Sequence, residues 1–402
     1  MSDLTAIRPD FSQPIEPLMG LEIEMFGFDS ESLAPLGTPG ARVSSQELMQ
    51  RIASSQGKLK TDSVSGEIIG LDLGCGNFSL EPGGQLEYAS CPGVSLRGLL
   101  GDLRQGLEIL EEAGGGQVLF LDHGTNPLAG ADLPLLVPKH RYRILDRFFA
   151  SQPGGRGVHM MRYSATAQPN VDVPGGLAEW QDAIKLTLAL TPLVKKLFAN
   201  SWFFQGKRVA PGSERQRIWD AIDASRTGVP PVSSAPDIAA AYAAWGRKAF
   251  VFLAGDLPLE EQPLYGQLTY EQWEASGWKG RFPTAQDWET HLGTLFPDLR
   301  LRRFLEVRMV DAQTFSQALA PMAFWAVALR EGRARLWDWL GSKSDSAVEL
   351  LEVVQGCAED ELARSVLGAF GEHVRAGVPE WSSAAEFVRA EATAHPSRKL
   401  IL

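Results

Sequence analysis

Two glutamates near the start of the sequence occupy alternate positions, the spacing that places side chains on one face of a β-strand. In GLEIEMF at residues 20–26, Glu22 and Glu24 share one face, and the apolar residues between and beside them share the other. Neighbouring carboxylates repel each other and need cations to stay charged. Clusters rich in carboxylate oxygen suit the hard ions Mg²⁺ and Mn²⁺, which also bind nucleotide phosphates.

Three further segments repeat this alternation of polar and apolar residues. A solvated outer face is the ordinary explanation for any single strand of an antiparallel sheet. The four segments together contain no lysine, although lysine commonly protects exposed sheet edges. We therefore predict that their polar side chains face a shared metal and nucleotide site. The polar residues of the three segments are Glu81, Gln85 and Glu87, then Thr166, Gln168, Asn170 and Asp172, and finally Glu306 and Arg308.

Two arginines in the middle of the chain add positive charge of the kind that a nucleotide triphosphate requires. Arg215 lies in SERQRIW and Arg226 in SRTG, in a stretch that we expect to be turn-rich because it lacks strong helical periodicity. Isolated arginines are more often surface charges, but a guanidinium also binds phosphate or carboxylate in a bidentate manner. The sequence contains neither GxxxxGK[ST] nor GxGxxG, so P-loop, kinase and Rossmann folds are disfavoured.

The elements that must position these residues are short strands in the first half of the chain and helices in the second. Up to about residue 172, extended runs alternate with turns, interrupted by predicted helices at 43–54 and 96–113. Predicted helices follow at 177–199, 236–247, 321–332, 344–355, 358–376 and 384–394. This order predicts an α+β fold with a sheet-centred body and a helical C-terminal lobe.

The composition of the 402 residues is that of a globular protein, with 44% hydrophobic and 22% charged residues. A net charge of −11 disfavours nucleic acid as a partner. We expect no membrane span and, because the first residues lack an apolar signal core, a cytoplasmic location. Cys75, Cys91 and Cys357 show no CxxC spacing, so we expect reduced thiols, with Cys91 packed rather than redox-active; a disulfide between one pair is the alternative.

Seven segments, taken in order, resemble the glutamate-cysteine ligases of the plant and proteobacterial type and their actinobacterial relatives. Each segment alone is a weak signal, but seven in the family's order over residues 20–330 indicate membership. They are GLEIEMFGF, EPGGQLEYAS, PKHRYRIL, MMRYSATAQPNVDV, LFANSWFFQGK, RQRIWDAIDASRTGVPP and DWETHLGTLFPDLRLRRFLEVR.

The resemblance implies a glutamine-synthetase-like catalytic funnel made of a curved, mostly antiparallel sheet flanked by helices. It divides the chain into an N-terminal arm (1–19), a catalytic domain (20–330) and a helical C-terminal lobe packed on the same body (331–402). The implied reaction uses ATP and Mg²⁺ or Mn²⁺ to phosphorylate the γ-carboxylate of glutamate, and the amine of cysteine then attacks the acyl phosphate. The product, γ-glutamylcysteine, would serve glutathione or a related thiol.

The resemblance also implies roles for the residues that match its motifs. Arg215 and Arg308 are expected to be catalytic, with Arg308 neutralising the γ-phosphoryl group. Gln168, Asn170, Arg215, Arg226 and Arg308 are expected to contact substrate or nucleotide. The expected metal ligands or their immediate supports are Glu22, Glu24, Glu81, Glu87 and Glu306.

Three departures from the plant-type pattern leave the amine acceptor open. Within 160–173, Tyr163 stands where the family usually has arginine, and Pro169 stands where a β-branched residue is common. After Arg308 the chain reads Met309-Val-Asp-Ala instead of a glycine-rich continuation, and residues 232–234 replace an aromatic, acidic loop. An ATP-dependent ligase with a different amine acceptor is therefore an alternative. A non-catalytic protein that binds nucleotide or amino acid is a third hypothesis. The sequence does not indicate an oligomeric state.

Overall fold

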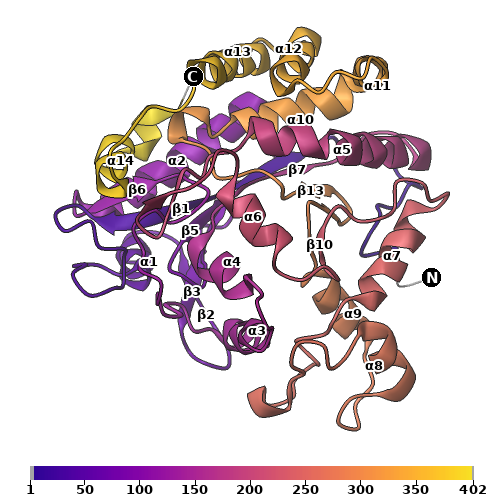
Figure 1. Ribbon diagram of the computed structural model, residues 1–402, viewed down its shortest axis with the longest axis horizontal. Coiled ribbons are helices and arrows are strands. Elements are labelled where there is room, and N and C mark those ends of the chain that lie inside the picture. Colours follow the sequence, from indigo (N-terminus) through magenta and orange to yellow (C-terminus); the bar gives the residue numbers. More distant parts are fainter. Residues whose placement is uncertain (1–3, 401–402) are drawn as a thin grey trace.

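The computed structural model describes residues 4–400, and its centre is an antiparallel sheet built around one long strand, β1 (Met19–Asp29). Figure 1 shows helices above and below this sheet. The strand order is β12-β13-β7-β1-β5-β4-β3-β2, and β6 pairs with the far half of β1. The other strands are β2 (Lys58–Thr61), β3 (Ile68–Asp72), β4 (Asn77–Leu80), β5 (Leu86–Ala89), β6 (Val118–Leu121), β7 (Ala167–Val171), β12 (Leu299–Leu301) and β13 (Leu305–Val307).

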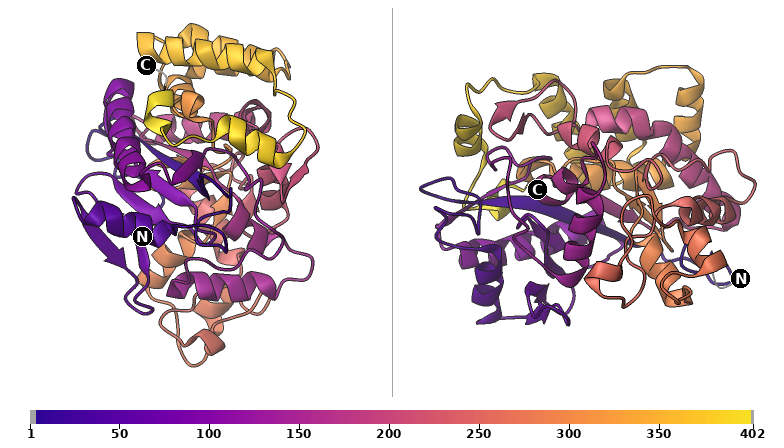
Figure 2. Two further views of the ribbon diagram at one scale, coloured as in Figure 1. Left: turned by 90° about the vertical axis from the view of Figure 1, so that its left-hand side faces the viewer. Right: turned by 60° about the horizontal axis from the view of Figure 1, so that its bottom comes forward.

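One face of the sheet carries the hydrophobic core. Leu21, Ile23 and Met25 of β1 are at most 2% exposed and belong to the largest apolar cluster. Helix α10 packs on β1 and β7, and α2 packs on α1 beside the sheet. The helices on this side also include the C-terminal ones, as two further views show (Figure 2). They are α1 (Ser45–Ala53), α2 (Leu96–Gly114), α5 (Leu177–Leu197), α10 (Ala320–Arg330), α11 (Arg333–Gly341), α12 (Ala347–Cys357) and α13 (Glu361–Ala376). The last helix, α14 (Ala384–Glu391), belongs to a separate apolar cluster with Phe26 and Phe28 of β1.

Shorter helices and two small two-stranded sheets face the opposite side of the sheet or extend beyond its end. The helices are α3 (His140–Ala150), α4 (Gly157–Tyr163), α6 (Glu214–Asp220), α7 (Ile238–Lys248), α8 (Tyr270–Ser276) and α9 (Ala285–Leu292). The small sheets pair β8 (Phe203–Phe204) with β9 (Lys207–Arg208), and β10 (Thr227–Gly228) with β11 (Phe296–Pro297). No helix among residues 4–400 is long and apolar enough to span a membrane.

The α+β class and the mostly antiparallel sheet with flanking helices are confirmed. Most predicted long helices lie within a few residues of their expected bounds, because a continuous apolar stripe defines them. The expectation of a turn-rich stretch around Arg215 is wrong, since Glu214–Asp220 forms α6 after the cap residue Ser213. Seven residues are too few to show a helical period, which explains the error.

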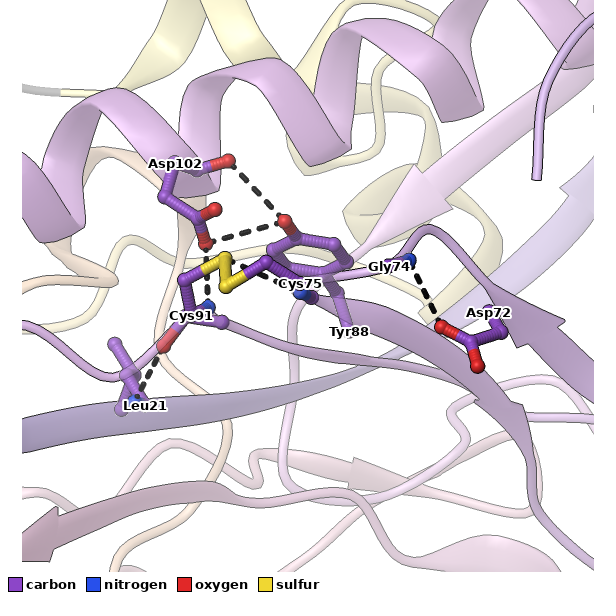
Figure 3. The surroundings of a disulfide bond; sticks show 9 residues. Leu21, Asp72, Gly74, Cys75, Tyr88, Cys91 and Asp102 are labelled. Carbon is purple, nitrogen blue, oxygen red and sulfur yellow. Dashed lines mark hydrogen bonds between the residues drawn. A yellow bond between two sulfur atoms is a disulfide. The ribbon is translucent and has the colours of Figure 1, made fainter.

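The expectation of reduced thiols is also wrong for two of the three cysteines. Cys75 and Cys91 form a disulfide (Figure 3), with Cα atoms 5.3 Å apart, whereas Cys357 is free. The register explains the pairing, because Asn77 of β4 lies opposite Ala89 of β5 and each cysteine lies two residues beyond. Asp102 of α2 holds this end of the hairpin by accepting hydrogen bonds from the Cys91 N–H at 3.0 Å and the Tyr88 hydroxyl at 3.1 Å.

Candidate active site

The polar face of the sheet brings the predicted site residues together. The antiparallel register places them opposite one another in pairs: Glu24 with Glu87, Glu22 with Gln168, and Glu306 with Asn170. Because the apolar face of β1 is committed to the core, all of these side chains point to the other side. The strand alternation in the sequence therefore predicted the correct face.

The carboxylates of β1 are held by groups from β7 and the residue before it. The side-chain amides of Gln168 and Asn170 donate to Glu22 at 2.8 and 3.0 Å. The main-chain N–H of Thr166 donates to Glu24 at 3.0 Å. These bonds orient one or both oxygens of each carboxylate, and they add no positive charge to compensate it.

Two more carboxylates come from the β4–β5 hairpin. Glu81 lies in its turn and accepts a hydrogen bond from the hydroxyl of Tyr142 at 2.9 Å. Glu87 of β5 accepts one from Ser79 across the ladder at 2.5 Å. Both glutamates line the same cavity as Glu22 and Glu24.

Burial in this cluster makes negative charge costly. Burial, together with the charge of Glu306, raises the pKa of Glu22 to about 7, and burial with the charge of Glu81 raises the pKa of Glu24 to about 8. The pKa of Glu87 also lies well above its ordinary value, first through burial and then through Glu22. A divalent cation would relieve this cost, so the donor set fits Mg²⁺ or Mn²⁺.

The glutamates do not form a closed cage for one ion. Residues 4–400 hold no group of three acidic, histidine or cysteine side chains positioned to bind a single metal. This arrangement agrees with the chemistry of Mg²⁺, which proteins usually bind through one or two carboxylates while phosphate and water complete the octahedron. The predicted ligand set thus fits ions shared with a nucleotide better than a preassembled metal centre.

Glu306 differs from the other four glutamates because arginines surround it. It accepts hydrogen bonds from Arg300 at 2.8 Å and from Arg308 at 2.5 Å, and Arg302 lies 3.3 Å away. Although burial opposes ionisation, these cations lower the pKa of Glu306 to about 2. Arg308 also donates to Gln168 at 2.5 Å. Glu306 is therefore an anchor for Arg308, in agreement with a supporting role beside the metal ligands.

The cavity in front of these side chains has a volume of about 370 Å³. One wall is the polar face of the sheet. The opposite wall comes from α3, α4, α6 and β11 and is largely apolar. Its apolar residues are Leu145, Met160, Met161, Trp219 and Phe296.

The cavity lining also includes cations that the motif analysis missed: Lys139, Arg141, Arg300 and Arg302. Lys139 and Arg141 lie in the segment PKHRYRIL, where no strand alternation marked them. Arg300 could have been found from the sequence, because a hairpin over LRLRRFLEV places it opposite Glu306. Burial and the neighbouring Arg308 lower the pKa of Arg300 to about 10, so it remains charged at neutral pH.

Arg215 lies directly behind the cavity. Its guanidinium is fully buried, stacks on Trp219 at 4.5 Å and donates from Nη2 to the carbonyl of Arg308 at 3.0 Å. It is absent from the cavity lining, yet its charge lowers the pKa of Glu24 against the effect of burial. Arg215 therefore acts on the carboxylate cluster electrostatically, through the layer formed by Trp219 and Arg308.

Arg226 does not reach the cavity. Its guanidinium is fully buried and donates to Asp223 at 2.8 Å, to the Thr294 carbonyl at 3.0 Å and to the Phe250 carbonyl. These partners engage every nitrogen of a side chain that is fully buried and absent from the cavity lining, so Arg226 is not placed to contact a phosphate there. The predicted ligand contact is replaced by a structural role in joining three segments.

The antiparallel sheet and the cavity lined by carboxylates and cations suit a protein that binds a nucleotide together with divalent ions. The sequence model of Glutamate-cysteine ligase family 2 (GCS2) matches residues 18–363, so the chain belongs to this family.

Similar proteins agree with this assignment. The chloroplastic glutamate-cysteine ligase of Solanum lycopersicum is 31% identical over 351 residues, covering 81% of this chain and 63% of that protein. The corresponding enzyme of Nicotiana tabacum is 32% identical over 354 residues, covering 84% and 64%. This chain thus spans slightly less than two thirds of the length of these relatives.

The crystal structure of glutamate-cysteine ligase from Francisella tularensis, solved in complex with AMP, is similar with a TM-score of 0.52. The match covers 98% of this chain and 85% of that one at 12% identity. At this identity the likeness supports the fold alone.

Proposed function

We propose that the protein is an ATP-dependent glutamate-cysteine ligase. The observation that carries the proposal is the single cavity in which four glutamates face Arg308 and further cations. Such a cavity suits a phosphoryl transfer between two negatively charged molecules, which proceeds mainly through positioning and charge neutralisation. Membership of the glutamate-cysteine ligase family and the names of the relatives support the choice of substrates.

The four glutamates that lack arginine partners are the proposed metal ligands: Glu22, Glu24, Glu81 and Glu87. Mg²⁺ held there would neutralise the nucleotide phosphates. Arg308, fixed by Glu306 and Gln168, would donate to the γ-phosphoryl oxygens while the γ-carboxylate of glutamate attacks. Arg215 would add positive potential from behind Trp219.

A second cavity of about 340 Å³ adjoins the first at Glu22 and Phe304. Its lining is mainly apolar, from Leu18–Leu21, Ala89 and Pro92, and also includes Ser90, Asn170 and Asp172. Its apolar character suits the base of ATP, with the phosphates directed toward the glutamates. The substrate glutamate would then bind in the cationic part of the first cavity, where Arg141 and Arg300 would pair with its carboxylates.

The amine acceptor is assigned to the apolar wall of α3, α4 and α6. Thioethers and aromatic rings favour a sulfur-containing side chain, so Met160, Met161 and Trp219 suit cysteine. Its amine would attack the acyl phosphate, and a carboxylate of the cluster or the departing phosphate would accept the proton. The proposed location is the cytoplasm, as the sequence predicts.

The test is a phosphate-release assay with Mg²⁺, ATP and glutamate, with and without cysteine, combined with product mass. Cysteine-dependent release together with the mass of γ-glutamylcysteine supports the proposal. Turnover with another amine, but not with cysteine, would reassign the acceptor and keep the ligase chemistry. Binding of Mg·ATP without turnover across a panel of amines would indicate a non-catalytic member of the family.

A further inference from the structure

Asp311 is a buried carboxylate that the proposed reaction does not use directly. It lies three residues after Arg308 in the Met309-Val-Asp-Ala sequence and is 1% exposed. Its Oδ2 accepts hydrogen bonds from the main-chain N–H of Asn200 and the hydroxyl of Ser201, both at 2.8 Å. Its Oδ1 accepts one from the hydroxyl of Ser213 at 2.7 Å.

These partners come from segments that otherwise have no assigned role. Asn200 and Ser201 belong to the LFANSWFF segment, and Ser213 is the N-cap of α6. Gly124 packs closely against the Asp311 carboxylate, since a Cβ atom added at Gly124 would lie 2.7 Å from the Asp311 carboxyl carbon. Only glycine fits there without moving the carboxylate, so the aspartate is held from every direction.

The carboxylate and its two serine partners also contact Arg215 or the helix that carries it. The Arg215 Nη1 atom lies 3.9 Å from Asp311 Oδ1. The Ser201 hydroxyl that donates to Asp311 also accepts the main-chain N–H of Arg215 at 3.2 Å. Ser213 likewise donates to Asp311 while it caps the helix that carries Arg215. Asp311 therefore fixes both the main chain and the charge of this arginine.

We propose that Asp311 is the positioning residue of the active site, acting through Arg215. Arg215 donates to the carbonyl of Arg308 and forms a long ion pair with the Asp311 carboxylate, so the three groups adjoin one another behind the carboxylate cluster. Asp311 itself is absent from the cavity lining and touches no substrate. The proposal rests on the proposed function, because it assigns Asp311 to the charge arrangement beside the transferred phosphoryl group.

The test is a double-mutant cycle of Asp311→Asn and Arg215→Met, read as kcat of the full-length protein. Asp311→Asn keeps the shape and removes the charge, and we expect kcat to fall about tenfold or more while KM for ATP changes much less. In the Arg215→Met background the same change should alter kcat by less than about twofold, because coupled residues are not additive.

The matched control is Asp287→Asn. Asp287 is also buried and accepts hydrogen bonds from a hydroxyl, Thr284, and a guanidinium, Arg281, but it lies outside the cavity. The Asp287→Asn variant should lower the melting temperature, as Asp311→Asn does, and should leave kcat near the wild-type value. Equal losses of kcat from Asp311→Asn in both Arg215 backgrounds, or unchanged kcat, would overturn the proposal. If Asp311→Asn does not fold, Ser201→Ala takes its place in the cycle.

A second readout is independent of turnover: the ¹⁵N–¹H signal of Arg215 Nε in protein labelled at arginine, assigned through Arg215→Met. Asp311→Asn, or Ser201→Ala in its place, should shift or broaden this signal, whereas Asp287→Asn should leave it in position. If wild type shows no ligase turnover, the proposed function fails, and this signal still decides the link between Asp311 and Arg215. An unperturbed signal in the Asp311 variant would refute the link.

Discussion

Replacing Arg308 by lysine separates its geometry from its charge. Arg308 lines the cavity, and its guanidinium donates from Nη1 alone to Glu306 and Gln168, at 2.5 Å each. An ammonium group keeps the charge but cannot hold these anchors and bind a phosphoryl oxygen at the same time.

The expected magnitude follows from the loss of one charge-assisted hydrogen bond. Such a bond contributes about 1.5–3 kcal/mol, which corresponds to a fall in kcat/KM of about 10- to 100-fold. The loss should appear mainly in kcat, because the bond to the transferred group strengthens in the transition state.

Steady-state phosphate release at saturating ATP and glutamate measures this effect. Arg303→Lys is the matched control, since Arg303 is an exposed arginine of the same hairpin turn and has no bond to Glu306. It should keep wild-type turnover, and a melting temperature for Arg308→Lys near that of wild type would show that the fold is intact. Wild-type kcat in Arg308→Lys would refute the assignment of Arg308 to the transferred phosphoryl group.

Three further predictions concern charge and covalent structure. Glu24→Gln should lower kcat by about two orders of magnitude or more, because a proposed metal ligand is lost; normal kcat would remove Glu24 from the site. Burial and the charge of Glu81 raise the pKa of Glu24 to about 8, so the folded protein holds this proton more tightly than the unfolded chain. Without Mg²⁺, the wild type should therefore lose stability as the pH rises from 5 to 8, and glutamine at position 24 removes this loss. The melting temperature of Glu24→Gln, measured relative to wild type, should rise over the same range. A flat difference would contradict the buried carboxylate, and added Mg²⁺ should stabilise wild type more than the variant. Reducing the Cys75–Cys91 disulfide with a dithiol should lower the free energy of unfolding of the wild type by about 3 kcal/mol, the value expected for a loop of this length. The same dithiol should not change the stability of Cys75→Ser, which has no disulfide at this position. Denaturant unfolding measures both free energies.

The sequence predicted the sheet face of the site because a strand has a fixed period of two. Glu22 and Glu24 could be placed on one side without knowing their partners, since the alternate residues of β1 had to enter the core. The pairing of Glu24 with Glu87 was less accessible, because it depends on a register that only the folded sheet defines.

Arginines were predicted less well than glutamates, because long side chains reach in directions that the local sequence does not determine. Arg215 and Arg226 lie eleven positions apart in similar surroundings, yet one lies behind the cavity and the other is fully bonded to Asp223, Thr294 and Phe250. The partners of Arg226 come from the chain near residue 250 and from the loop before β11, which no short motif connects to it. Tertiary contacts alone separated the two roles.

The two walls of the cavity differ in how freely evolution or a designer can change them. Ser90 fixes the sheet wall by bonding both the N–H and the carbonyl of Leu21, and a one-residue slip there would turn Glu22 and Glu24 into the core. The same register of β1 therefore places the glutamates in the carboxylate cluster and the apolar residues in the core. The opposite, apolar wall carries no such constraint, since Met160 of α4 and Phe296 of β11 come from separate segments. If the proposed function holds, side-chain exchanges on that wall would accommodate a new acceptor and leave the carboxylate face of the sheet unchanged.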